Sequence, residues 1–175
     1  MDDVTQTVLI ARFQPMVLLR WFEETRFSDW VLTSMIGFPL MLSLHAVGMA
    51  ISVGLLIVLN LRLLGLFQVI SWSFMLRALG LVWLGLCVNF LSGVALFLPR
   101  GAEYVRDPAF ITKIFLICVG VLITRYLRKI LASQSELWHV SRGAPPRLRF
   151  CAVISILVWF GTIMSGRLIA YIGSF

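Results

Sequence analysis

The sequence predicts an all-α integral membrane protein, in which a four-helix transmembrane bundle follows an amphipathic helix at the membrane surface. Three observations predict this fold. Of the 175 residues 60% are hydrophobic, and the mean hydropathy is +0.96, whereas a soluble domain has about 45–50% apolar residues. Four stretches are long and apolar enough to cross a hydrocarbon core of about 30 Å, which takes about 20 helical residues. No Asp or Glu interrupts any of these stretches.

Residues 1–32 form the amphipathic segment, and residues 33–175 form the transmembrane domain. Between Thr7 and Trp30 apolar residues recur near helical spacing among charged ones, and Pro15 interrupts or starts a helix. This pattern is typical of a helix on a membrane surface or of a helix packed on a partner protein. We expect no signal peptide, because Asp2 and Asp3 stand where a basic start is needed.

The four spans are expected at residues 35–59, 72–98, 109–127 and 148–171. Pro39 lies in the first turns of the first span, where a helix tolerates proline best. The second and third spans are separated by a polar loop that has Pro99 and Pro108 at its ends. The longest polar connection precedes the fourth span and contains His139, which we expect to be solvated.

Basic residues predict the orientation of the bundle. The first and third connections carry Glu136 as their one acidic residue, and they hold Arg62, Arg128, Lys129, Arg142, Arg147 and Arg149. The positive-inside rule counts basic residues and gives little weight to acidic ones. It therefore places these connections in the cytoplasm, and it places both termini in the periplasm if the membrane is a bacterial inner membrane.

The net charge of +7 does not indicate nucleic-acid binding, since no nucleic-acid motif occurs and the basic residues gather at span ends and in loops. At those positions they set the topology and contact lipid headgroups, so membrane lipids are the expected partners. The three cysteines fall inside predicted spans without a CxxC pattern, which is typical of buried apolar residues.

His45 is the residue that most strongly indicates a functional site, because an ionisable side chain at membrane depth is costly. Asn89, Lys113, Arg167 and Tyr171 lie in the same half of the predicted bundle. We expect the first three to converge with His45 on an outer-leaflet pocket, in which Asn89 satisfies one ring nitrogen and leaves the other for a ligand or water. Alternatively, Lys113 and Arg167 extend to the headgroups, and His45 only makes a packing hydrogen bond.

The chain has no Ser/His/Asp order, no HExxH motif, no paired carboxylates and no phosphate-binding glycine loop, so we do not expect it to catalyse a reaction alone. One hypothesis is a non-catalytic subunit of a larger redox or energy-transducing membrane complex, with other membrane protein subunits as partners. The alternative is a carrier that holds haem b or a quinone at the outer-leaflet pocket. For haem, His45 would be the iron ligand, either as the one protein ligand or together with a second axial ligand from a partner chain.

Four motifs resemble an uncharacterised family of small bacterial four-span membrane proteins that carry a domain of unknown function. They are HAVGMAISVGLLIVLNLRLLGL (residues 45–66), NFLSGVALF (89–97), DPAFITKIFLI (107–117) and WFGTIMSGRLIAY (159–171). The family patterns are HxxGxAxxVG ending in DLRLLG, a second-span motif ending in LF, PAFxxK, and WxGxxxxGRxIAY. The histidine helix and the Phe-x-x-Lys pattern are also similar, more weakly, to the copper-resistance D membrane family.

This resemblance implies the four-span fold and makes His45, Lys113 and Arg167 motif positions, but it implies no established activity. The chain departs from the family pattern at Asn60, where the family has Asp. It also has Ile123 and Arg128 where the family often has Asn and His. If that second His is a ligand in the family, its absence argues against a haem site formed by this chain alone.

Overall fold

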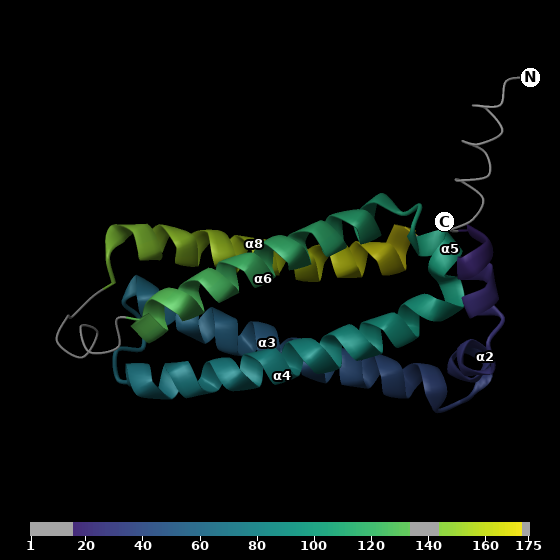
Figure 1. The fold of residues 1–175 in the computed structure, drawn as a ribbon, viewed down its shortest axis with the longest axis horizontal. Helices are drawn as coiled ribbons and strands as arrows, with labels where there is room; N and C mark the ends of the chain where they lie inside the picture. The colour runs from purple at the N-terminus through teal and green to yellow at the C-terminus, as the bar shows by residue number, and fades with distance from the viewer. Residues whose placement is uncertain (1–15, 134–143, 173–175) are drawn as a thin grey trace, which may run out of the picture.

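The computed structural model describes residues 16–133 and 144–172, with side chains as far as Ile169. Four long helices lie side by side along one axis, and no strand occurs among the described residues (Figure 1). These helices are α3 (Gly37–Leu64), α4 (Trp72–Phe97), α6 (Pro108–Ser133) and α8 (Pro146–Ile172). All four are long and apolar enough to cross a membrane. The predicted fold class, an all-α membrane protein with a four-helix bundle, is therefore confirmed.

Two of the helices extend past the predicted span ends. The first span was expected to end at residue 59, but α3 continues to Leu64, where Gly65 closes it with a φ of +103°. Glycine adopts this left-handed conformation without steric cost. Likewise α6 continues past residue 127 to Ser133. Polar residues mark where a helix leaves the hydrocarbon, but they do not end the helix itself, so the sequence pattern underestimates its length.

The bundle consists of two antiparallel pairs, α3 with α4 and α6 with α8. Each pair packs extensively, α8 also packs on α3, and α4 contacts α6 only slightly. The α3–α4 pair is close because glycines face each other across it. A Cβ built on Gly48 would lie 2.6 Å from the backbone nitrogen of Asn89, and one on Gly85 would lie 2.8 Å from that of Ser52. Small residues at these positions let the two backbones approach closely, as is common in membrane bundles.

The apolar core fills the half of the bundle farthest from α2 (Arg26–Thr33). Its largest fully buried side chains are Leu56, Leu59, Leu63, Leu79, Leu127 and Leu131. Asn60 is fully buried among them, and its Nδ2 donates to Ser155 Oγ of α8 at 2.9 Å. Many other apolar side chains point outward along all four helices, for example Leu84, Phe115 and Phe160. Such an apolar exterior is suited to contact with lipid.

The N-terminal segment is helical but broken. Residues 16–23 form a short helix, and a turn at Glu24 and Thr25 leads into α2. Thr25 caps α2 by accepting a hydrogen bond from the Ser28 backbone nitrogen at 3.3 Å. Trp21 and other apolar residues of this segment are exposed, as an interfacial segment requires. Over its described part, the predicted surface helix is two short helices; Pro15 lies outside the described residues.

The expected loop after the second span is also mostly helical. It contains η1 (Leu98–Arg100) and α5 (Gly101–Tyr104), which lie beside the N-terminal helices (Figure 1). Glu23 Oε1 accepts a hydrogen bond of 2.8 Å from the Ala102 backbone nitrogen and so attaches the N-terminal segment to this end. The rings of Phe97, Tyr104 and Phe110 stack on one another and join α4, α5 and α6 here.

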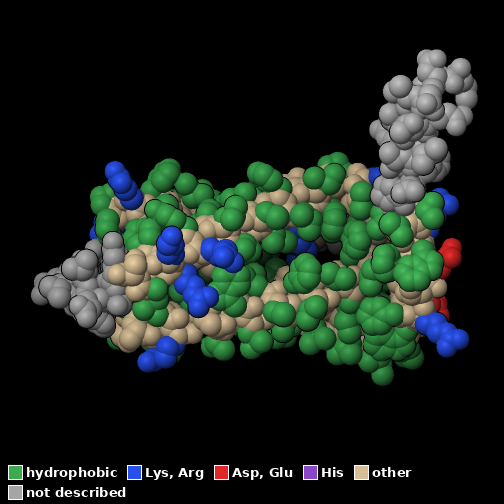
Figure 2. All heavy atoms as spheres, viewed as in Figure 1, with side chains coloured by type: hydrophobic (Ala, Val, Ile, Leu, Met, Phe, Trp, Pro, Cys, Tyr) green, Lys and Arg blue, Asp and Glu red, His purple; other side chains and the backbone are tan. Residues whose placement is uncertain are grey.

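Charge is distributed unevenly along the bundle. In Figure 2 the acidic side chains lie at the end that carries α2 and α5, where basic side chains also occur, and further basic side chains are spread over the opposite half. The acidic residues of the described part are Glu23, Glu24, Asp29, Glu103 and Asp107. All of them belong to the N-terminal segment or to the connection between α4 and α6.

Candidate functional site

A cavity of about 180 Å³ lies between the two helix pairs, where α4 and α6 separate. All four long helices contribute to its wall, and most of the wall is apolar. The polar or charged lining residues are His45 and Ser52 of α3, Trp83 and Asn89 of α4, Lys113 of α6, and Trp159 and Thr162 of α8. The cavity begins at the edge of the leucine core, near Trp159, and extends from there toward the end of the bundle that carries α2.

His45 is half-buried on α3 and turns its ring toward α4. Its Nδ1 lies 3.0 Å from the backbone carbonyl oxygen of Asn89 and 3.2 Å from Ser92 Oγ. The carbonyl can only accept, so Nδ1 carries the proton. The Ser92 hydroxyl lies 2.7 Å from the backbone oxygen of Val88, to which it donates, and this leaves a lone pair to face Nδ1–H.

This hydrogen bond fixes the chemistry of the other ring nitrogen. With the proton on Nδ1, a neutral imidazole has a free lone pair on Nε2. Nε2 makes no hydrogen bond within the described residues. A histidine held through Nδ1–H to a backbone carbonyl is also the arrangement that orients Nε2 for a metal or a hydrogen-bond donor. His45 therefore offers one oriented acceptor at the cavity.

Asn89 is the partner expected for His45, but through different atoms. The prediction assigned its side-chain amide to an imidazole nitrogen. Instead, its backbone carbonyl accepts from the ring, and its Nδ2 donates to the backbone oxygen of His45 at 2.9 Å. The backbone oxygen of His45 also accepts the helical hydrogen bond from the residue four positions later in α3, so the Asn89 amide gives this oxygen a second donor.

Small residues of α4 make room for the imidazole. A Cβ built on Gly93 would lie 3.2 Å from Cε1 of His45, so the ring sits directly over this glycine. Gly48 lies on α3 near the same contact and brings the backbone of Asn89 within reach. The spacing of Gly48 after His45 was noted in the sequence motif, and its physical reason is this close approach.

Lys113 reaches the cavity from α6. Its side chain passes over Gly166 of α8, where a built Cβ would lie 3.5 Å from the ammonium nitrogen. No salt bridge to an acidic residue occurs among the described residues, and no Asp or Glu occurs within any of the four long helices. The side-chain nitrogen at the cavity therefore keeps its hydrogen-bond donors for another partner.

The structure brings together His45, Asn89 and Lys113, and it leaves Arg167 outside the cavity. Arg167 follows Gly166, so it is rotated by about 100° around α8 relative to the residue that faces Lys113, and its side chain is exposed. Tyr171 lies in the last turn of α8, but its side chain is outside the described residues, as is His139.

Sequence reasoning did not assign Trp83 and Trp159 to the site. Trp159 is 2% exposed and packs against Gly120 of α6, where a built Cβ would lie 2.9 Å from its ring. The buried Nε1 atoms of Trp159 and Trp83 have no hydrogen-bond partner among the described residues. The signal that could have identified them is position, because an indole N–H deep in a span cannot reach the headgroups and needs an acceptor there.

The cavity suits a single ring better than a macrocycle. A cavity of about 150 Å³ accommodates benzene, whereas a haem macrocycle is several rings wide. No group of three or more His, Cys, Asp or Glu side chains that could hold a metal ion occurs in the part of the chain that the structure describes. Comparisons with protein-family models, curated proteins and solved structures found no match to this chain.

Proposed function

We propose that this membrane protein binds a quinone in its reduced form, the quinol, without catalysing its conversion. The observation that carries the proposal is the set of free hydrogen-bonding groups at one apolar cavity. His45 Nε2 offers a lone pair, and the Lys113 ammonium offers donors. A quinol has an O–H group that can donate to Nε2, and the oxygen across its ring can accept from the donors.

The apolar surroundings support a ligand that arrives from the bilayer. Phe90 lines the cavity and is 69% exposed, so its ring connects the cavity to the lipid-facing surface of α4. The slight contact between α4 and α6 leaves room beside it for an apolar tail. A water-soluble ligand would gain less from this site, because most of the lining is apolar.

The haem alternative receives less support. His45 could ligate an iron through Nε2, and Lys113 could pair with a propionate. The cavity has the volume for one ring, and a haem would have to lie partly outside it, against a partner chain that supplies the other axial ligand. An absorption spectrum of the purified protein separates the two ligands, since only haem gives a Soret band.

If the membrane is a bacterial inner membrane, the charge distribution supports an orientation with both termini in the periplasm. The basic half of the bundle then faces the cytoplasm, and the acidic residues near α2 and α5 lie outside. In this orientation the His45 cavity opens in the outer leaflet. Reporter fusions at the C-terminus test it, and a cytoplasmic C-terminus would exclude it.

A second candidate function is that of a non-catalytic subunit in a larger membrane complex. The observation that favours it is the N-terminal segment, which exposes Val17, Leu18 and Trp21 while Glu23 anchors it to the bundle. These side chains suit either lipid or an apolar partner surface. Native gels after mild detergent extraction test it: a co-migrating chain supports it, and a monomer alone counts against it.

Co-purification tests the quinone proposal. Protein purified in mild detergent is extracted with organic solvent, and quinone in the extract is quantified by chromatography. We expect close to one quinone per wild-type protein and strong depletion in His45→Asn, which keeps a donor near the Nδ1 position but lacks Nε2. Arg167→Gln is the matched control, because Arg167 lies outside the cavity, and it should retain quinone. An extract of the wild type without quinone would contradict the proposal.

A further inference from the structure

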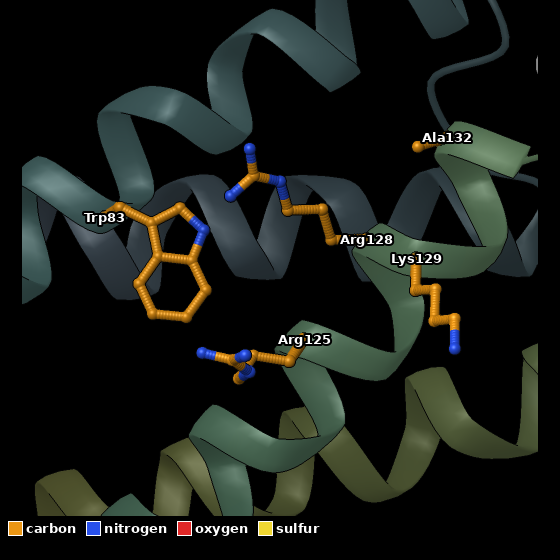
Figure 3. Close-up of a pocket in the computed structure, with 5 residues that line it drawn as sticks. All are labelled: Trp83, Arg125, Arg128, Lys129 and Ala132. Atoms are coloured by element: carbon orange, nitrogen blue, oxygen red, sulfur yellow. The ribbon is translucent and has the colours of Figure 1, made fainter.

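A second cavity, of about 360 Å³, lies between α4 and α6 in the basic half of the bundle. It is lined by Trp83 of α4 and by Arg125, Arg128, Lys129 and Ala132 of α6 (Figure 3). Trp83 also lines the His45 cavity, so its indole stands between the two. Arg125, Arg128 and Lys129 do not line the His45 cavity, so the inference below does not depend on the proposed quinone site.

The two arginines converge on the tryptophan. Figure 3 shows the guanidinium groups of Arg125 and Arg128 extending toward Trp83 and away from Ala132, which marks the C-terminal end of α6. The indole lies between them, with its nitrogen on the side of Arg128. Helical side chains lean toward the N-terminus of their helix, so this direction follows from the backbone. It also means that these arginines do not extend toward the nearest end of the helix.

Every polar group in this cluster is a donor. A guanidinium has five N–H donors and no acceptor, and an indole has one N–H and no acceptor. The buried Trp83 Nε1 has no hydrogen-bond partner among the described residues. No Asp or Glu occurs in α4 or α6, and the described residues form no salt bridge. What the cluster lacks is one shared anionic acceptor.

We propose that this cavity binds the phosphate of an anionic phospholipid. A phosphodiester supplies acceptor oxygens for both guanidinium groups. Lys129 stands at the rim, nearer the end of the helix, where it adds charge. Leu122 lies one turn before Arg125 and is 66% exposed, so an acyl chain can run along α6 from the bound headgroup. A zwitterionic lipid fits less well, because its choline group adds a cation beside three others.

The test compares lipid retention by native mass spectrometry. The full chain, purified in neutral detergent, is mixed with phosphatidylglycerol or phosphatidylcholine at equal concentration. We expect the wild type to retain phosphatidylglycerol about thirtyfold more than phosphatidylcholine, since two arginine contacts at about 1 kcal/mol each correspond to this ratio. Arg125→Gln/Arg128→Gln should reduce this preference to near unity.

The matched control is Arg147→Gln/Arg149→Gln, which removes two exposed arginines at the same end of the bundle, on α8. It should keep the preference of the wild type. Equal retention of both lipids by the wild type would overturn the proposal, and so would an equal loss in the α8 control, which would indicate general charge attraction. Millimolar inorganic phosphate is the remaining arm: if it displaces phosphatidylglycerol, the site binds free phosphate and the lipid assignment is wrong.

Discussion

His45 and Asn89 hold each other through reciprocal side-chain to backbone hydrogen bonds. The imidazole Nδ1–H donates to the backbone oxygen of Asn89 at 3.0 Å, and Asn89 Nδ2 donates to the backbone oxygen of His45 at 2.9 Å. The two bonds fix the register of α3 against α4 at the level of the cavity. They also determine which imidazole nitrogen remains available.

Replacing the asparagine should weaken this helix pair. Asn89→Leu removes the amide that donates to the backbone oxygen of His45, so α3 and α4 lose one interhelical hydrogen bond. We expect the free energy of unfolding to fall by about 0.6–1.7 kcal/mol. Reversible unfolding in mixed micelles measures it. Ser92→Ala is the control, because the Ser92 hydroxyl bonds mainly within its own helix, and its effect should be smaller. An equal effect of both variants would contradict the role assigned to Asn89.

The tautomer of His45 can be observed directly. The chain has only two histidines, so a His139→Gln variant leaves one imidazole signal in a ¹⁵N-histidine spectrum. Because Nδ1 donates to a carbonyl, we expect a protonated Nδ1 and an unprotonated Nε2 for neutral His45. A spectrum with the proton on Nε2 would show that the ring is held differently.

Glycine substitutions should separate contact positions from open ones. Gly48→Ala and Gly85→Ala place a Cβ under 3.0 Å from backbone atoms of the facing helix, so the helices must move apart. We expect each to cost about 1–3 kcal/mol, as overpacking does. Gly54→Ala and Gly80→Ala are matched controls, since a Cβ at either position meets nothing within 4 Å. Comparable losses at all four positions would contradict the close approach of α3 and α4.

The buried Asn60–Ser155 pair should show coupling. Ser155→Ala leaves the Asn60 amide without its acceptor, and we expect it to cost about 1–3 kcal/mol. Asn60→Leu/Ser155→Ala removes both polar groups, so it should recover most of that loss. A double-mutant cycle in the same micelles measures the coupling. Additive effects of the two substitutions would show that the bond contributes nothing to stability.

The fold could be predicted from the sequence because apolar length alone identifies a span. The direction of His45 followed in the same way, since a short ionisable side chain at that depth has to face protein. The atoms of the His45–Asn89 contact could not be predicted, because they depend on the rotation of α4 about its own axis. Arg167 was expected near Lys113 from depth, but depth does not specify the helix face. The arginine cluster at Trp83 was missed because the basic residues at span ends were assumed to extend to the headgroups.

The central claim is that the His45 cavity holds the ring of a quinol through a hydrogen bond to Nε2. Titration of a short-chain quinol into the protein in lipid nanodiscs tests this claim most directly. Calorimetry should give saturable binding with one site per wild-type chain. His45→Asn should bind about tenfold more weakly, which corresponds to one lost hydrogen bond of about 1.4 kcal/mol, and Arg167→Gln should match the wild type. Equal affinity of His45→Asn and the wild type, or no saturable binding by the wild type, would contradict the claim.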